Sequence, residues 1–145
     1  MARTGEVVEL GSAVVETAFF GKTYGEAMSL LVEARNYLTY LEPLDRAGLG
    51  PLDRLRLCCE TMRLTARLTQ IMAWLLAQRA VHAGEITHDE ALADPHTLAE
   101  LEVCMSDSDI DEALLPPRLV RLLDRSQHLY VRVARLDEFA RRRVS

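Results

Sequence analysis

The longest stretch without a helix breaker runs from Leu52 to Gly84 and contains no Pro or Gly before Gly84 itself. Its apolar residues recur at alternating steps of three and four, the spacing of one face of an α-helix. The stripe that we predict to be core contains Leu57, Leu64, Leu68, Ile71 and Leu75. A second stripe beside it contains Leu55, Cys58, Met62, Thr65, Thr69, Met72 and Leu76. Together they form an apolar face about twice the usual width, which predicts the central helix of a bundle, covered by two neighbours.

The remaining side of this predicted helix is polar, with one exception. It carries Arg56, Glu60, Arg63, Arg67 and Gln70, and the large apolar residue Trp74 projects from it. In one interpretation Trp74 packs under the N-terminal segment, against Phe19 or Phe20, and the arginines pair with Glu60 and with acids of residues 85–112. In the other interpretation the side is a partner-docking patch, because Trp and Arg dominate the energetics of protein interfaces. The candidate partner-binding residues are Arg56, Arg63, Arg67 and Trp74.

A long helix is expected on each side of the central one. Thr23–Glu26 has the pattern of a capping box and predicts a helix to about Leu41. The predicted core stripe of this first helix is Met28, Leu31, Ala34, Leu38 and Leu41. Breakers between Pro43 and Pro51 predict a hairpin into the central helix. Pro116-Pro117 opens the last helix, whose predicted core stripe is Leu119, Leu122, Leu123, Ser126, Leu129, Tyr130, Val133 and Leu136.

The connector between the second and third helices has short-range helical signals. Gly84 is expected to end the central helix, and the capping patterns Thr87–Glu90 and Thr97–Glu100 to start short helices. The fold class is therefore predicted to be all-α, a three-long-helix antiparallel bundle with short helical turns in this connector. At 145 residues the chain suits a single domain, with residues 1–11 and 140–145 loosely ordered.

Charge is distributed unevenly along the chain. Residues 1–84 carry nine acids and nine bases, residues 85–113 carry ten acids and no Lys or Arg, and residues 114–145 carry eight Arg and three acids. Either the acidic connector lies over the basic last helix, or one of the two is a docking surface. The candidate acidic surface consists of Asp107, Asp109, Asp111 and Glu112.

No motif of a catalytic, metal or phosphate site is evident. The spacing of His82, His88, His96 and Cys104 matches no standard zinc pattern, so no metal and no cofactor are expected. A pI of about 5.4 argues against nucleic-acid binding. The sequence lacks an apolar run of membrane-spanning length and an N-terminal signal pattern. The three cysteines do not suggest a disulfide framework. We expect a cytoplasmic protein that is not inserted into a membrane.

The central segment from Glu60 to Glu85 resembles the signature of the RcdA family (regulator of CtrA degradation), small proteins of alphaproteobacteria. That signature reads E-[ST]-M-R-L-T-x-R-L-x-Q-x-x-[SA]-W-L-L-x-Q-R-A-V-x-x-G-E. The matching residues are Glu60, Met62, Arg63, Leu64, Thr65, Arg67, Leu68, Gln70, Trp74, Leu75, Leu76, Gln78, Arg79, Ala80, Val81, Gly84 and Glu85. Weaker matches extend the resemblance over most of residues 15–139.

The resemblance implies a three-helix bundle that forms a homodimer and has no enzymatic activity. It implies an adaptor that helps deliver cargo, including a cell-cycle regulator, to the ClpXP protease together with a response-regulator-like partner. The resemblance also allows recruitment to a cell pole by such partners. The alternative is a dimeric helical regulator of a different signalling or cell-division target, not linked to proteolysis.

Overall fold

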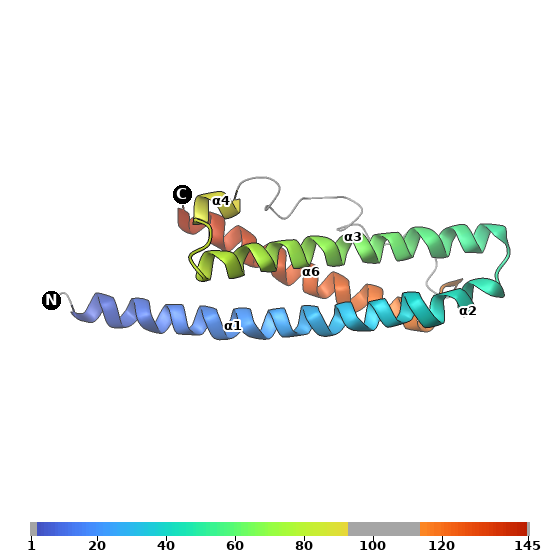
Figure 1. The fold of residues 1–145 in the computed structure, drawn as a ribbon, viewed down its shortest axis with the longest axis horizontal. Helices are drawn as coiled ribbons and strands as arrows, with labels where there is room; N and C mark the ends of the chain where they lie inside the picture. Colours follow the sequence, from blue (N-terminus) through green and yellow to red (C-terminus); the bar gives the residue numbers. More distant parts are fainter. Residues whose placement is uncertain (1–2, 93–113, 145) are drawn as a thin grey trace.

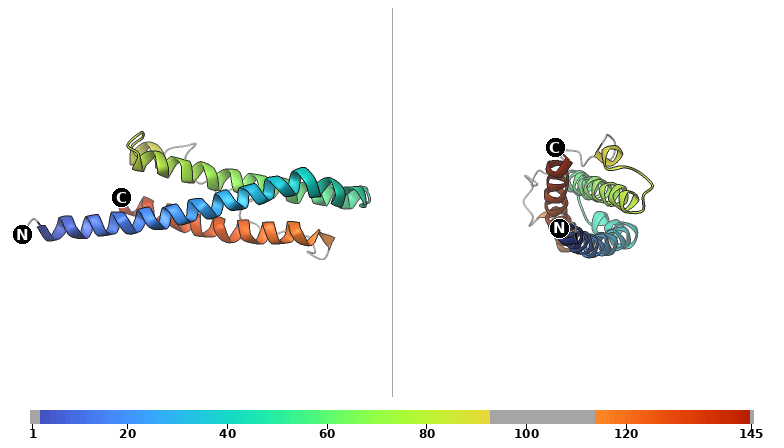
Figure 2. Two further views of the ribbon diagram at one scale, coloured as in Figure 1. Left: turned by 60° about the horizontal axis from the view of Figure 1, so that its bottom comes forward. Right: turned by 90° about the vertical axis from the view of Figure 1, so that its left-hand side faces the viewer.

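The computed structural model describes residues 3–92 and 114–144, and helices account for nearly all of them (Figure 1). The described helices are α1 (Arg3–Asn36), the π-helix η1 (Tyr37–Leu41), α2 (Glu42–Ala47), α3 (Pro51–His82), α4 (His88–Leu92) and α6 (Pro117–Val144). The three long helices α1, α3 and α6 lie side by side in an elongated bundle (Figure 2). The predicted all-α, three-long-helix bundle is confirmed.

The relative direction of α3 and α6 differs from the predicted antiparallel arrangement. α1 runs antiparallel to both, but α3 and α6 run parallel, because Arg67 contacts Ser126 and Trp74 contacts Asp137 further along both helices (Figure 1). The reason is the length of the chain between them. The 34 residues between His82 and Pro117 can span more than the length of α3, about 48 Å for its 32 residues. The chain can therefore return to the hairpin end before α6 begins.

The first helix starts much earlier than predicted. α1 begins at Arg3 and passes through Thr23, which is buried in the helix interior instead of capping its start. Gly21 and Gly25 also lie within α1. Each costs about 1 kcal/mol relative to Ala in a helix interior, a cost that packing of a long helix can offset. The helices extend from residue 3 and up to residue 144, and the loose order of residues 1–11 and 140–145 stays a prediction.

Other predicted boundaries are confirmed by the backbone. α3 ends at His82, and Gly84 adopts a left-handed conformation with φ of 74°. The amide of Gly84 donates to the Val81 carbonyl at 3.0 Å and that of Glu85 to the Ala80 carbonyl at 2.9 Å, which is a Schellman motif. Glycine suits this position because a Cβ disfavours positive φ.

The short helix α4 begins where the capping pattern predicted it. The amide of Glu90 donates to the Thr87 hydroxyl oxygen at 3.1 Å, so Thr87 caps this helix. The second predicted start, Thr97–Glu100, lies outside the described residues. α6 begins at Pro117, as the double proline predicted.

The hairpin between α1 and α3 contains an irregular turn. η1 follows α1 directly, and Pro43 lies in the first turn of α2 instead of ending a helix. The buried Tyr37 hydroxyl donates to a carboxylate oxygen of Asp45 at 2.9 Å and so ties η1 to α2. Burial and this hydrogen bond raise the pKa of Tyr37 well above its ordinary value, which keeps the phenol protonated.

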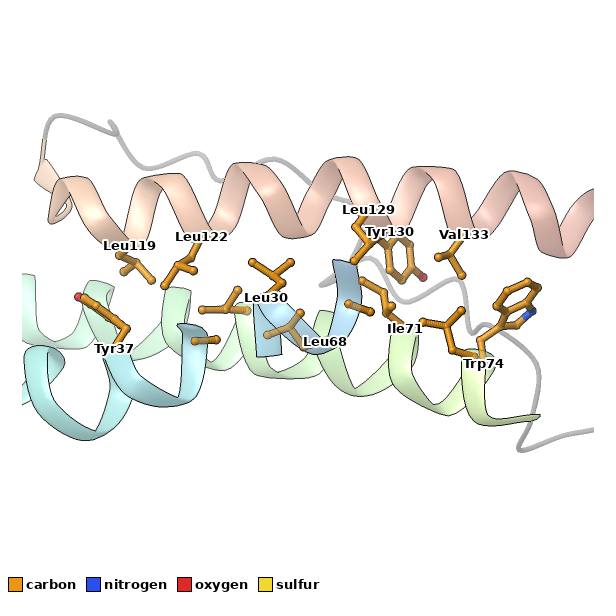
Figure 3. Close-up of a cluster of buried hydrophobic side chains, with 14 of the residues drawn as sticks. Leu30, Tyr37, Leu68, Ile71, Trp74, Leu119, Leu122, Leu129, Tyr130 and Val133 are labelled. Carbon is orange, nitrogen blue, oxygen red and sulfur yellow. The ribbon is translucent and has the colours of Figure 1, made fainter. Parts of the chain in front are cut away.

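The hydrophobic core runs along the axis between the three long helices (Figure 3). α3 contributes Leu64, Leu68, Ile71 and Leu75, all buried. α6 contributes Leu119, Leu122, Leu129, Tyr130 and Val133. α1 and η1 contribute Ala27, Leu30, Ala34 and Tyr37.

This α1 stripe differs from the predicted one. Met28 is 36% exposed, and Leu31 and Leu38 are only partly buried. The helix is rotated by about one residue position relative to the predicted face, because small Ala27 and Ala34 allow the close approach of its neighbours.

Truncation of Leu68 tests this core. Leu68→Ala is expected to lower the free energy of unfolding by about 2–5 kcal/mol, because Leu68 is 3% exposed and its loss leaves a cavity. Leu44→Ala is the control, since Leu44 lies on α2 and is 71% exposed. Urea unfolding followed by circular dichroism measures both, and equal effects of the two substitutions would contradict this packing.

Candidate functional site

Arg67 is a buried residue at the contact between α3 and α6. Its side chain is 2% exposed, and its guanidinium donates to the Leu123 carbonyl and to the Ser126 hydroxyl, each at 2.9 Å. Ser126 is itself fully buried and donates to the Leu123 carbonyl at 2.9 Å. Arg67 therefore holds α3 to one turn of α6.

Trp74 makes a second buried polar contact between the same helices. It is 4% exposed, and its indole nitrogen donates to a carboxylate oxygen of Asp137 at 2.9 Å. The other oxygen of Asp137 accepts from Arg141 at 3.1 Å. The indole ring packs in the core next to α6 (Figure 3). The indole N–H thus has a hydrogen-bond acceptor, and the apolar ring is buried, both inside the bundle.

The other two arginines of the candidate patch have local partners. Arg63 lies 3.5 Å from the carboxylate of Glu60, which is 1% exposed, within α3. Arg56 pairs with Asp53 at 3.1 Å, and both are partly exposed. A partly exposed ion pair such as Arg56–Asp53 contributes little to stability.

The four residues therefore do not form one docking patch. Arg67 and Trp74 are enclosed by α6, while Arg63 and Arg56 are held by acids of their own helix. Trp74 is covered within the chain by α6, whereas Phe20, one of its two predicted neighbours, packs on Tyr24 and His82. The side chain of the other, Phe19, lies outside the described residues. The acidic candidates Asp107, Asp109, Asp111 and Glu112 lie outside the described residues.

The predicted core stripe of α3 is confirmed, since Leu57, Leu64, Leu68, Ile71 and Leu75 are all buried. The buried face extends from this stripe into the side that we predicted to be polar and exposed, and not into the second apolar stripe. This face includes an inner seam of Leu57, Glu60, Leu64, Arg67, Ile71, Trp74 and Gln78, all buried. They follow alternating steps of three and four, the spacing of a helix seam. The position of a Trp within that spacing is the sequence signal that could have identified it.

The second apolar stripe of α3 faces outward instead of into the core. We call it the outer seam: Leu55, Cys58, Met62, Thr65, Thr69, Met72 and Leu76. Leu55, Met62 and Leu76 are each more than half exposed, and Cys58 is exposed as well. Among the described helices none covers this seam completely. It has the heptad spacing by which one helix packs on another.

A groove of about 550 Å³ follows the outer seam between α1 and α3. Leu31 and Ala34 of α1 and Leu38 of η1 line it on one side, and Leu68, Met72 and Leu76 of α3 line it on the other. The exposed Met28 and Val32 extend the apolar surface on α1. Large exposed apolar patches mark interaction sites in proteins, so the groove and the outer seam are the candidate functional site.

The described part of the chain shows no constellation for metal chemistry. No group of three or more His, Cys, Asp and Glu residues that could hold a metal ion occurs within it. Among its helices, none is both long and apolar enough to cross a membrane.

Comparisons with known proteins agree with the signature in α3. Residues 11–145 match the family described as "Protein of unknown function (DUF1465)". The crystal structure of RcdA from Caulobacter crescentus CB15 has 36% sequence identity to this chain and a TM-score of 0.69. The match covers 83% of this chain and 89% of that one. The chain belongs to the RcdA family. A search of curated proteins gave no match.

Membership of the RcdA family connects the signature with the fold. Arg67, Trp74 and Gln78, which match the signature, lie in the inner seam, while Met62, Thr65 and Leu76 lie in the outer seam. The similarity to RcdA supports, at a coarse level, a role like that of a proteolysis adaptor.

Substitution of Trp74 separates a core role from a docking role. Trp74→Ala is expected to lower the free energy of unfolding by about 3–5 kcal/mol. Trp74→Phe is expected to cost about 1–3 kcal/mol, because it removes the donor to the buried Asp137. Arg56→Ala is the control and is expected to change stability by less than about 0.5 kcal/mol. Denaturant unfolding is the measurement, and an unchanged midpoint for Trp74→Ala would contradict the buried position.

Proposed function

We propose that this protein is a non-enzymatic adaptor in regulated proteolysis that helps deliver cell-cycle regulator cargo to the ClpXP protease. The observation that carries the proposal is the 36% identity to RcdA over most of both chains. The exposed apolar groove supports it, because an adaptor works by contacts with other proteins. Its partners are a protease-associated or response-regulator-like protein and the cargo, and the protein acts in the cytoplasm.

The outer seam is the surface through which we propose that two copies form a homodimer. Its heptad spacing matches a second helix with the same spacing. In a C₂ dimer the same patch of both copies meets itself, which suits an apolar seam whose charged neighbours lie at its edges. Burial of Leu55, Met62 and Leu76 removes side chains that are more than half exposed in one copy. The hydrophobic effect favours this association.

Loss of the dimer on charge insertion tests this surface. Met62→Glu and Leu76→Glu are each expected to leave the chain at its monomer mass of 16.3 kDa, because a carboxylate would be buried without a partner. The unaltered chain is expected at twice that mass. Light scattering at micromolar concentrations measures both. Leu44→Glu is the control, because Leu44 is 71% exposed on α2, away from the seam.

A dimer that survives both outer-seam substitutions would show that another surface joins the copies. A monomeric unaltered chain at all concentrations would contradict the homodimer itself. Circular dichroism of each variant shows whether the fold is retained.

The adaptor proposal is tested by reconstitution. Addition of the purified chain to ClpXP, a response-regulator-like partner and a cell-cycle regulator is expected to increase the rate of cargo loss. A chain with Leu76→Glu reports whether the outer seam is needed, with Leu44→Glu as its control. Affinity capture from an alphaproteobacterial lysate is expected to enrich ClpX and response-regulator proteins. Enrichment of a sensor kinase or a division protein, without protease components, would favour the alternative regulator.

A further inference from the structure

A second groove, of about 610 Å³, lies between the end of α1, η1 and the first turns of α6. We propose that this groove binds an acidic peptide segment of a protein partner. The proposal rests on the proposed adaptor function for the nature of its ligand, a protein, and adds its charge and its place. The groove is distinct from the α1–α3 groove, since the two have no lining residue in common.

Two cations of this groove are available for a ligand. Arg118 and Arg121 are exposed and line the groove from α6. Within the part of the chain that the structure describes, neither forms an ion pair. The next arginine on the same side, Arg125, differs from them because it is paired with Glu33 of α1. Arg binds carboxylates by two parallel hydrogen bonds, so two guanidinium groups without an ion pair among the described residues suit acidic side chains.

The groove also has an apolar floor. The rings and methyl groups of the buried Tyr37 and Leu122 form it, together with the partly buried Leu41. Tyr37 and Leu41 are the first and last residues of η1, and π-helical turns are frequent at functional sites. A peptide that places an aliphatic side chain on this floor can direct its flanking carboxylates to the arginines.

The charge within the groove has the opposite sign to that of the whole chain. Arg125 and Glu33 offset each other, which leaves Arg118 and Arg121 against Asp124. The groove is thus net positive on a chain of formal charge −5. Local complementarity of this kind selects partners and orients them. Asp124 is the one groove carboxylate that would oppose an acidic ligand without being offset.

An acidic peptide fits these observations better than a nucleic acid. A nucleic-acid site needs an extended basic face and aromatic rings on which bases stack. Here Glu33 and Asp124 interrupt the basic residues, and the Tyr37 ring is 2% exposed and hydrogen bonded to Asp45. A short segment with alternating aliphatic and acidic residues can place its aliphatic side chains on the apolar floor and its carboxylates on the arginines.

Fluorescence anisotropy with the full chain tests the proposal. The probe is a fluorescein-labelled peptide with three acidic residues on each side of one leucine. Its comparison peptide has Asn and Gln in place of Asp and Glu. The acidic peptide is expected to bind saturably, and the amide peptide at least about tenfold more weakly, because close charge pairs across an interface contribute this much or more. A labelled oligothymidine is the third probe.

Variants locate the binding to this groove. Arg121→Glu is expected to weaken binding of the acidic peptide by about tenfold or more, and Asp124→Asn to strengthen it. Arg135→Glu is the matched control, because Arg135 is exposed on α6 outside the groove and its substitution changes the net charge equally. It is expected to change binding less than about twofold, because it acts only through the long-range electrostatic field of the protein, which salt screens. Circular dichroism checks that each variant folds.

Several results would overturn the proposal. These are equal weakening by Arg135→Glu and Arg121→Glu, equal binding of the acidic and amide peptides, stronger binding of oligothymidine, or no saturable binding at low salt. None of them involves ClpXP, so failure here leaves the adaptor proposal standing. Conversely, a chain that does not support cargo loss could still bind the acidic peptide, and the two failures are therefore distinguishable.

Discussion

The buried polar contact of α3 with α6 is the constraint on which the arrangement of the bundle depends. Apolar side chains alone would allow two parallel helices to slide or rotate against each other at small cost. Arg67 prevents this, since its guanidinium must meet the Leu123 carbonyl and Ser126 to offset its burial. Trp74 adds a second fixed point at Asp137. Two such contacts, seven residues apart on α3, fix both the register and the rotation of the helix, because a shift of α3 would separate both buried donors from their acceptors.

The rotation of α3 in turn decides which residues can bind a partner. The helix has two seams with the same alternating spacing, and only one can face the core. With Glu60, Arg67 and Trp74 turned inward, the apolar Leu55, Met62 and Leu76 are turned outward. The same contact that stabilises the bundle therefore leaves an apolar surface on a chain that has no described helix to cover it completely. A dimer through this seam would bury it, which is why the stability of the fold and its association are linked in our proposal.

The sequence predicted the parts of the fold that local chemistry decides. Gly84 ends α3, Thr87 caps α4 and Pro117 opens α6 because each acts through its own backbone or side chain. It predicted the buried leucine stripe of α3 but assigned the wrong neighbouring stripe to the core. Assigning polar residues to the outside is wrong where arginine and tryptophan find acceptors on another helix. It also failed for the start of α1 and the direction of α6. The start of α1 was missed because a capping pattern at Thr23 competes with continuation of the helix through that residue. The direction of α6 was missed because a connection of 34 residues permits either direction. The candidate patch failed for the same reason, because it was placed on the side of α3 that packs against α6. The two grooves could not be predicted, since they depend on tertiary packing that no local pattern contains.

The helix α1 separates the two surfaces that we propose for binding. Leu31 of α1 and Leu38 of η1 face the groove beside α3. Glu33 of α1 and Tyr37 of η1 face the groove beside α6. A second copy on the outer seam would therefore leave Arg118 and Arg121 accessible, and an acidic segment in the α6 groove would leave the seam free. An adaptor has to hold at least two proteins at once, so its binding surfaces must not overlap. This bundle meets that condition with three helices, because each pair of neighbours around α1 forms its own groove, one apolar and one basic.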